Sequence, residues 1–261
     1  MNVYRFLDVG VHSVPKNAFS PSEDVAVVTS TSMAVADGAT TKHVEGGAVA
    51  RISAGNVAQI VAETAAASSL NGTELVGDLN AVVARSSYHP SSCTLACVRL
   101  CGDTMVITMV GDTSVRVNGP NGTTYAHRMA IDELTAAARA HYIALTGDVN
   151  GSRDFIMPLL RMQSAYKNNE THPLGYGVID GTCTPDRFIR TVTLPLASVQ
   201  SVEVFTDGYA KLPDGITIAD WELAYAEMIG EDPDRCLGFP ATKPMDDRTV
   251  VTALIESSIA P

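Results

Sequence analysis

The chain has 261 residues, of which 46% are hydrophobic and 18% charged, and this length allows one large layered domain or two small ones. Its formal net charge of −11 argues against a nucleic-acid or anionic-membrane partner, because an acidic surface repels both. No apolar run approaches the ~20 residues needed to cross a bilayer, and the N-terminus lacks a signal peptide's apolar stretch, so we expect a cytoplasmic protein.

The N-terminal part of the chain predicts strands joined by tight turns. Residues 1–20 indicate a first strand followed by an irregular lead-in. Residues 25–30 and 33–36 are short apolar runs separated by a polar turn, which is typical of a hairpin. Such a hairpin would bring Asp24 and Asp37 to the same end of the two strands.

Two helices are expected next. Residues 47–69 are rich in alanine and carry apolar side chains near helical spacing, and residues 78–86 predict a second helix with Asp78 as its N-cap. Further strands are expected at 93–100, 105–110, 114–118 and 187–194, and two more end at Phe205 and Leu254. A strand and turn are expected at 174–181. Further helices are expected at 131–145, at 154–166, where Pro158 would lie in the first turn, and at 218–229.

The order of these elements predicts the fold class. A strict alternation of strand and helix is missing, which makes a doubly wound parallel sheet unsuitable. Consecutive short strands with tight turns favour antiparallel pairing instead. We therefore expect two antiparallel sheets with helices packed outside them.

Acidic residues stand at the ends of five expected strands. The apolar run 33–36 ends on Asp37-Gly38, and a carboxylate there is costly to desolvate unless a cation meets it. Asp-Gly is also a common hairpin turn, so a single instance is weak. Acids before or after an apolar strand recur at Glu23-Asp24, Asp112, Asp207 and Asp246. If these ends share one side of the sheets, their carboxylates repel each other unless cations bind there.

Carboxylates without cysteine or histidine partners form a hard, oxygen-only site, which favours magnesium, manganese or calcium. Such a site can hold two ions, with Asp37 as the bridge and the Gly38 carbonyl as a further ligand. Two ions lower the pKa of a shared water and neutralise a phosphoryl group, which suits hydrolysis of a phosphate monoester. Lys16 is the nearest candidate to bind the phosphate, and a solvated surface lysine is the alternative.

The remaining chemically versatile residues give weaker signals. The six histidines show no metal-binding spacing, and His43 alone is a candidate proton donor to a leaving group. Cys93, Cys97 and Cys101 are spaced to share one face of a strand, which predicts buried structural thiols, with zinc as the minor alternative.

Six short motifs follow one another along the chain. They are Ser22-Glu23-Asp24, Val35-Ala36-Asp37-Gly38, Ser92-Cys93-Thr94, Val110-Gly111-Asp112-Thr113, Thr206-Asp207-Gly208 and Asp246-Asp247-Arg248-Thr249-Val250. Their order and spacing resemble those of the metal-dependent protein phosphatases of type 2C, also called PPM-type, over nearly the whole chain. Each motif alone is weak, but six in this order are specific.

The resemblance implies an α+β fold, a four-layer α-β-β-α sandwich of two antiparallel sheets flanked by helices, as a single domain over residues 1–261. It implies hydrolysis of phosphoserine and phosphothreonine in proteins by a water activated between two Mg²⁺ or Mn²⁺ ions, with Asp37 bridging the ions. The first ion would also bind the Gly38 carbonyl, and the second ion would bind Asp207 and Asp246. Glu23 and Asp24 would hold ion-bound waters, and Asp112 would belong to a third, weaker site.

Three departures from the family pattern bear on the site. Many members grip phosphate with an arginine before the Glu-Asp motif, whereas here Lys16 stands nearby, as in a divergent branch. Lys211 replaces a family aspartate, which puts the third ion in doubt. His43 has no secure family counterpart, and residues 120–170 match no motif and could hold a substrate-recognition flap.

Two alternatives to a phosphatase remain. A catalytically silent relative could bind a partner through the same fold, although Asp37, Asp207 and Asp246 are all kept. A calcium-stabilised β-module would cluster its ligands within one short segment, whereas these acids are spread along the chain. For the phosphatase, we expect a phosphoprotein substrate and an opposing Ser/Thr kinase as a partner acting in trans.

Overall fold

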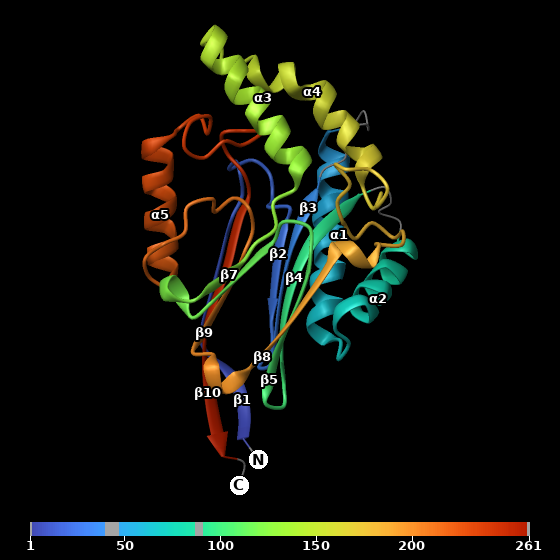
Figure 1. Cartoon of the computed structure of the whole chain (residues 1–261), viewed down its shortest axis with the longest axis vertical. Helices are drawn as coiled ribbons and strands as arrows, with labels where there is room; N and C mark the ends of the chain where they lie inside the picture. Colours follow the sequence, from blue (N-terminus) through green and yellow to red (C-terminus); the bar gives the residue numbers. More distant parts are fainter. Residues whose placement is uncertain (1, 40–46, 87–90, 260–261) are drawn as a thin grey trace.

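The computed structural model describes residues 2–39, 47–86 and 91–259, and it contains two five-stranded antiparallel sheets that face each other (Figure 1). The first sheet has the order β1 (Asn2–Val14), β10 (Arg248–Ile259), β9 (Ser201–Phe205), β6 (Ser114–Val117) and β7 (Thr123–Tyr125). The second has the order β2 (Asp24–Val28), β3 (Ser32–Ala39), β4 (Ser92–Cys101), β5 (Thr104–Val110) and β8 (Ile189–Pro195).

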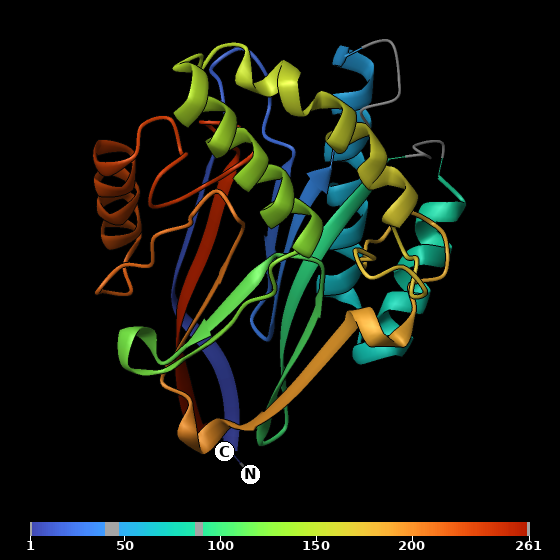
Figure 2. The same cartoon turned by 45° about the horizontal axis from the view of Figure 1, so that its top comes forward.

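Helices cover the outer faces of both sheets, which confirms the predicted α+β sandwich (Figure 1). Helices α1 (Gly47–Ala67) and α2 (Gly72–Ala84) pack on the second sheet, and α5 (Ile218–Glu231) packs on the first. Helices α3 (Ala130–Thr146) and α4 (Ser152–Met162) cross over one end of the sandwich (Figure 2). Among the described residues, no helix is both long enough and apolar enough to cross a membrane.

The alternation of side chains along the strands divides the interior into layers. In β4, Ala96 and Val98 point into the core between the two sheets, while Cys93 and Cys97 point into the core under α1 and α2. The prediction of buried structural thiols is confirmed for Cys93 and Cys97, whereas Cys101 at the strand end is only partly buried. Because β4 is covered on both faces, all of its residues except Cys101 are buried.

The predicted hairpin is present, with one difference. Strands β2 and β3 pair antiparallel, and Asp24 lies directly opposite Asp37. Strand β3 continues through Asp37 to Ala39 and pairs Asp37 with Thr94 of β4 on its other side. Asp37 thus belongs to the sheet itself, which fixes its backbone more firmly than a position in a turn would.

Three local predictions were wrong. Helix α2 begins at Gly72 with Asn71 as N-cap, so Asp78 lies inside the helix, because apolar side chains from Leu75 onward pack against the second sheet. Pro158 lies in the middle of α4 and not in its first turn. Proline cannot donate a hydrogen bond to the Asp154 carbonyl, and this is tolerated because both residues are exposed to solvent. Residues 174–181 form isolated bridges rather than a strand, and β7 occupies a stretch for which no strand was predicted.

One buried ion pair joins the first sheet to α5. Arg116 of β6 donates to Glu203 of β9 through Nε at 2.8 Å, and the Trp221 indole of α5 donates to the same carboxylate at 3.1 Å. Arg116 also donates to the carbonyls of Pro213 and Gly215 at 2.7 and 2.6 Å, which holds the segment leading to α5. Arg116 is 2% and Glu203 0% exposed, so the pair is almost completely removed from water.

We expect Glu203→Gln to lower the free energy of unfolding by about 3–5 kcal/mol, because it leaves the buried Arg116 guanidinium without a counter-charge. Chemical denaturation followed by fluorescence measures the effect. Arg5→Gln is the matched control, since it breaks the exposed Arg5–Glu256 pair and should cost about 0–1 kcal/mol. Equal effects from the two variants would contradict the structural importance of the buried pair.

Candidate metal centre

The acidic strand ends of both sheets meet at one place. Asp24 and Asp37 come from the paired strands β2 and β3, and Asp112 follows β5 of the same sheet. Asp207 follows β9 and Asp246 precedes β10, so both come from the first sheet. The Thr206 hydroxyl donates to Asp24 Oδ2 at 2.8 Å and links the two groups directly. These five aspartates are called the acidic cluster below.

Repulsion within the acidic cluster changes the ionisation of its members. Removal from water and repulsion by Asp246 raise the pKa of both Asp24 and Asp207 to about 7. Removal from water and the charges of Asp24, Asp207, Asp112 and Asp246 raise the pKa of Asp37 well above its usual range. Removal from water, and then the charge of Asp207, also raise the pKa of Asp112 well above its usual range. The cluster therefore favours protons or other cations.

The donor set fits a hard divalent cation. Asp24 is 5% exposed, and its Oδ1 is buried without a hydrogen-bond partner in the described part of the chain. An unpaired buried carboxylate oxygen is costly unless a cation or an ion-bound water meets it. Across the described ranges, no group of three or more histidine, cysteine, aspartate or glutamate residues is arranged to hold an ion directly. Water molecules or a shift of side chains would have to complete the coordination.

Glycine is required where two of the aspartates meet neighbouring backbone. A Cβ at Gly38 would lie 2.7 Å from the Glu23 carbonyl oxygen and 2.8 Å from that of Ala54 in α1. A Cβ at Gly208 would lie 2.2 Å from the Asp247 carbonyl oxygen. The two Asp-Gly pairs therefore let strand ends from different elements approach closely, and neither is a simple hairpin turn.

Lys16 is largely buried against two carboxylates and is not a solvated surface lysine. Its ammonium group contacts Glu23 and lies 2.8 Å from Asp247 Oδ2, and its side chain is 16% exposed. The Lys16 backbone N–H also donates to Asp247 Oδ1 at 2.8 Å. Burial alone would lower the pKa of Lys16, but its hydrogen bonds to Asp247 and Glu23 raise it. Lys16 is thus held as a cation beside the acidic cluster.

The structure adds three residues that the sequence did not single out. Lys243 forms an ion pair with Asp246 at 2.5 Å, and although burial alone would lower its pKa, attraction to Asp246 raises it. Asp247 binds Lys16, as described above. Asp132, in the first turn of α3, lies close enough to raise the pKa of Asp112 and Asp207. The acidic pair Asp246-Asp247 was a visible signal, whereas nothing in the local sequence marks Lys243 or Asp132.

Lys211 stands at a position where many family members have an aspartate. Lys211 forms ion pairs with Glu227 and Glu231 of α5 at 3.1 and 2.7 Å, which directs its ammonium group to that helix. His43 lies outside the described residues.

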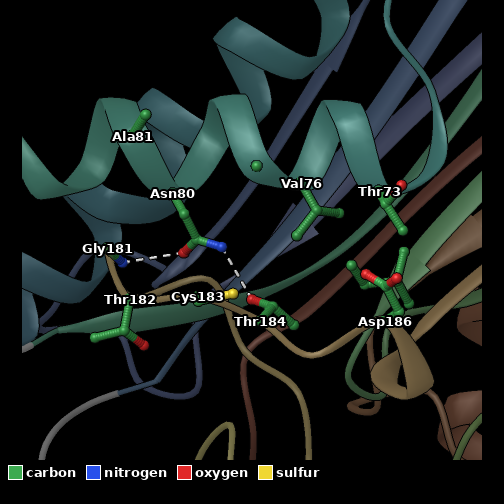
Figure 3. A pocket seen from close by; sticks show the side chains of 11 residues that line it. Thr73, Val76, Asn80, Ala81, Gly181, Thr182, Cys183, Thr184 and Asp186 are labelled. Atoms are coloured by element: carbon green, nitrogen blue, oxygen red, sulfur yellow. Dashed lines mark hydrogen bonds between the residues drawn. The ribbon is translucent and has the colours of Figure 1, made fainter.

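A separate cavity of about 300 Å³ lies between α2 and the segment that follows Asp180 (Figure 3). Asn80 of α2 spans it, donating to Thr184 Oγ1 at 2.9 Å and accepting from the Gly181 N–H at 3.1 Å. None of its lining residues belongs to the acidic cluster. Because the Asn80 amide is satisfied by the protein, we regard this cavity as a packing feature.

Comparison with known proteins places the chain in a family. The family model described as protein phosphatase 2C matches residues 22–232. Solved structures with the same fold include a bacterial serine phosphatase (14% identity, TM-score 0.54, covering 97% of this chain and 99% of that one). Serine/threonine phosphatase Stp1 from Staphylococcus aureus is similar at 16% identity and TM-score 0.53, covering 96% and 95% of the two chains.

The catalytic domain of the serine/threonine phosphatase PstP, solved in complex with two manganese ions, is similar at 14% identity and TM-score 0.52, covering 98% of this chain and 99% of that one. No curated protein sequence matches the chain at a significant level. At these sequence identities the solved structures show only that the fold is shared. The family model, however, spans most of the chain and includes the motifs around Asp24, Asp37, Asp112 and Asp207. The chain belongs to the protein phosphatase 2C family.

Proposed function

We propose that this chain hydrolyses phosphoserine and phosphothreonine in proteins with the help of two Mg²⁺ or Mn²⁺ ions. The observation that carries the proposal is the meeting of five aspartates from both sheets, one of which, Asp24, keeps a buried oxygen without a partner in the described part of the chain. A cluster of this kind is unfavourable by itself and becomes favourable with divalent cations.

Each acidic residue has a proposed role. Asp37 would bridge the two ions, because it pairs directly with Asp24 and lies close enough to Asp207 and Asp246 for their charges to raise its pKa. The Gly38 carbonyl would bind the first ion, and Asp207 and Asp246 the second. Bound ions would lower the pKa of a shared water and neutralise the phosphoryl oxygens.

The remaining residues would support these ions from a greater distance. Glu23 and Asp24 would accept hydrogen bonds from coordinated waters, and Asp24 is already oriented by the Thr206 hydroxyl. Asp112 would belong to a third, weaker site. Lys211 supplies no ligand to that site, because its ammonium group is paired with α5.

Lys16 would orient the phosphate. Glu23 and Asp247 hold its ammonium group next to the acidic cluster, and its contacts within the described ranges use two of the three N–H donors, which leaves one for a phosphate oxygen. Lysine acts here as a point charge and not as a bidentate fork, so we expect a looser grip than an arginine would give.

Family membership and the fold shared with PstP, which was solved with two manganese ions, support the proposal. An opposing Ser/Thr kinase as partner, a cytoplasmic location and a single domain over residues 1–261 remain predictions. A phosphoprotein substrate follows from the family.

The test is hydrolysis of p-nitrophenyl phosphate and of a phosphothreonine peptide by the purified chain. We expect turnover with added Mn²⁺ or Mg²⁺, complete loss with excess EDTA, and recovery when Mn²⁺ is restored, because only the ions make the acidic cluster catalytic. Calcium is a useful contrast, since it accepts the same oxygen ligands but supports this chemistry poorly. Absence of turnover with Mn²⁺ over pH 6–9 would reject the catalytic proposal and favour a silent relative.

A further inference from the structure

Lys243 places a protein cation within the acidic cluster. Its ammonium nitrogen lies 2.5 Å from Asp246 Oδ1, and the lysine and aspartate side chains are 28% and 19% exposed. The same Oδ1 accepts a hydrogen bond from the Asp247 backbone N–H at 2.8 Å. One oxygen of a proposed ligand for the second ion is therefore already engaged by two donors.

The backbone that carries Lys243 is held from the outside by two arginines of the α3–α4 pair. Arg153 of α4 donates to the Thr242 carbonyl at 2.6 Å, next to Lys243 in the chain. The buried Arg139 of α3 donates to the Ala241 carbonyl at 3.1 Å and to the Asp234 carbonyl at 2.8 Å. These bonds fix the approach of Lys243 to Asp246, so the ion pair is a built feature of the site.

We propose that the Lys243 ammonium group is an internal counter-cation, which competes with a divalent ion for Asp246 and thereby weakens binding of the second ion. This inference rests on the proposed function, because it concerns the same site. An ammonium group at hydrogen-bond distance from Asp246 Oδ1 repels a divalent ion at that carboxylate, so the ion must first displace Lys243.

Lys16 differs from Lys243 in a way that isolates the effect. Lys16 pairs with Glu23 and Asp247, neither of which is proposed to contact an ion directly. Lys243 pairs with Asp246, which is proposed to contact the second ion directly. Competition is therefore expected at Lys243, and it should lower the affinity for the second ion, which binds more weakly than the first.

The test is titration of the full chain with Mn²⁺, with free Mn²⁺ followed by electron paramagnetic resonance. Lys243→Gln keeps the length of the side chain and removes its charge, and we expect it to bind the second Mn²⁺ about tenfold more tightly than the natural chain. Lys243→Arg keeps the charge and should stay within about threefold of the natural affinity. Lys211→Gln is the matched control. The Lys211 side chain is 27% exposed, against 28% for Lys243, and it also pairs with carboxylates, but those lie on α5.

Thermal unfolding provides a second readout that does not depend on activity. Without ions, Lys243→Gln should melt at a lower temperature than the natural chain, since a favourable charge has been removed from the acidic cluster. With saturating Mn²⁺ the difference should vanish or reverse. If the variant is too unstable without ions, the affinity is measured from the Mn²⁺-loaded protein by competition with EGTA.

The outcomes separate this inference from the proposed function. Hydrolysis by the natural chain with an unchanged or weakened Mn²⁺ affinity in Lys243→Gln would overturn the competition and leave the phosphatase standing. Tighter Mn²⁺ binding by Lys243→Gln, together with no hydrolysis by the natural chain, would support the competition and reject the phosphatase. No Mn²⁺ binding by any variant would overturn both.

Discussion

Replacing Asp37 by asparagine is expected to lower kcat/KM for Mn²⁺-dependent hydrolysis by at least about a thousandfold, which corresponds to about 4 kcal/mol of lost transition-state stabilisation. The pKa of Asp37 is raised first by removal from water and then by the charges of four other members of the acidic cluster, Asp24, Asp207, Asp112 and Asp246. A group at this central position can serve two ions at once. An amide at the same position carries no charge to hold them together.

The measurement is steady-state hydrolysis of p-nitrophenyl phosphate over a range of Mn²⁺ concentrations, with the melting temperature of each protein recorded beside it. Asparagine is isosteric and removes one of several mutually repelling charges, so the fold should survive. Asp103→Asn, in the exposed turn between β4 and β5, makes the same chemical change away from the site and should leave turnover unaltered. A folded Asp37→Asn protein with more than a tenth of the natural activity would remove Asp37 from the bridging position.

The positions of most cluster members could be predicted from the sequence because they depend on local patterns. Each lies beside a short apolar run, and such runs, when bounded by turn residues, are typical of buried strands. The pairing of Asp24 with Asp37 follows from a hairpin with a short turn, which fixes the register of its strands. The family resemblance then supplies the convergence of the two sheets, which no local pattern shows.

Lys243 and Asp132 could not be predicted because their positions depend on tertiary contacts. Lys243 lies in an irregular segment, and its direction is set by guanidinium groups from α3 and α4 that are distant in sequence. The wrong start of α2 has a related cause. Asp78 is a good capping residue in isolation, but burial of the apolar side chains before it extends the helix back to Gly72.

The ion-free protein is expected to lose stability as the pH rises from about 5 to about 8. The pKa of Asp24 is raised from 3.8 to about 7, first by removal from water and then by its acidic neighbours, so the folded state holds a proton that the unfolded chain has already released. The corresponding stability is fully present below pH 3.8 and is lost as the pH rises through about 7. This pKa difference sets a ceiling of about 4 kcal/mol for Asp24 alone.

Asp24→Asn should therefore raise the stability of the ion-free protein at pH 8, by up to a few kcal/mol, and flatten its dependence on pH. The amide oxygen can still accept the hydrogen bond from Thr206 that the carboxylate accepts now. Chemical denaturation in EDTA at pH 5 and pH 8 measures both effects, with Asp103→Asn as the exposed control. Saturating Mn²⁺ should reverse the trend for the natural chain, because ions bind the deprotonated carboxylates and their affinity rises with pH. An ion-free protein that is more stable at pH 8 than at pH 5 would show that the acidic cluster is not under the electrostatic stress from which a metal centre is inferred.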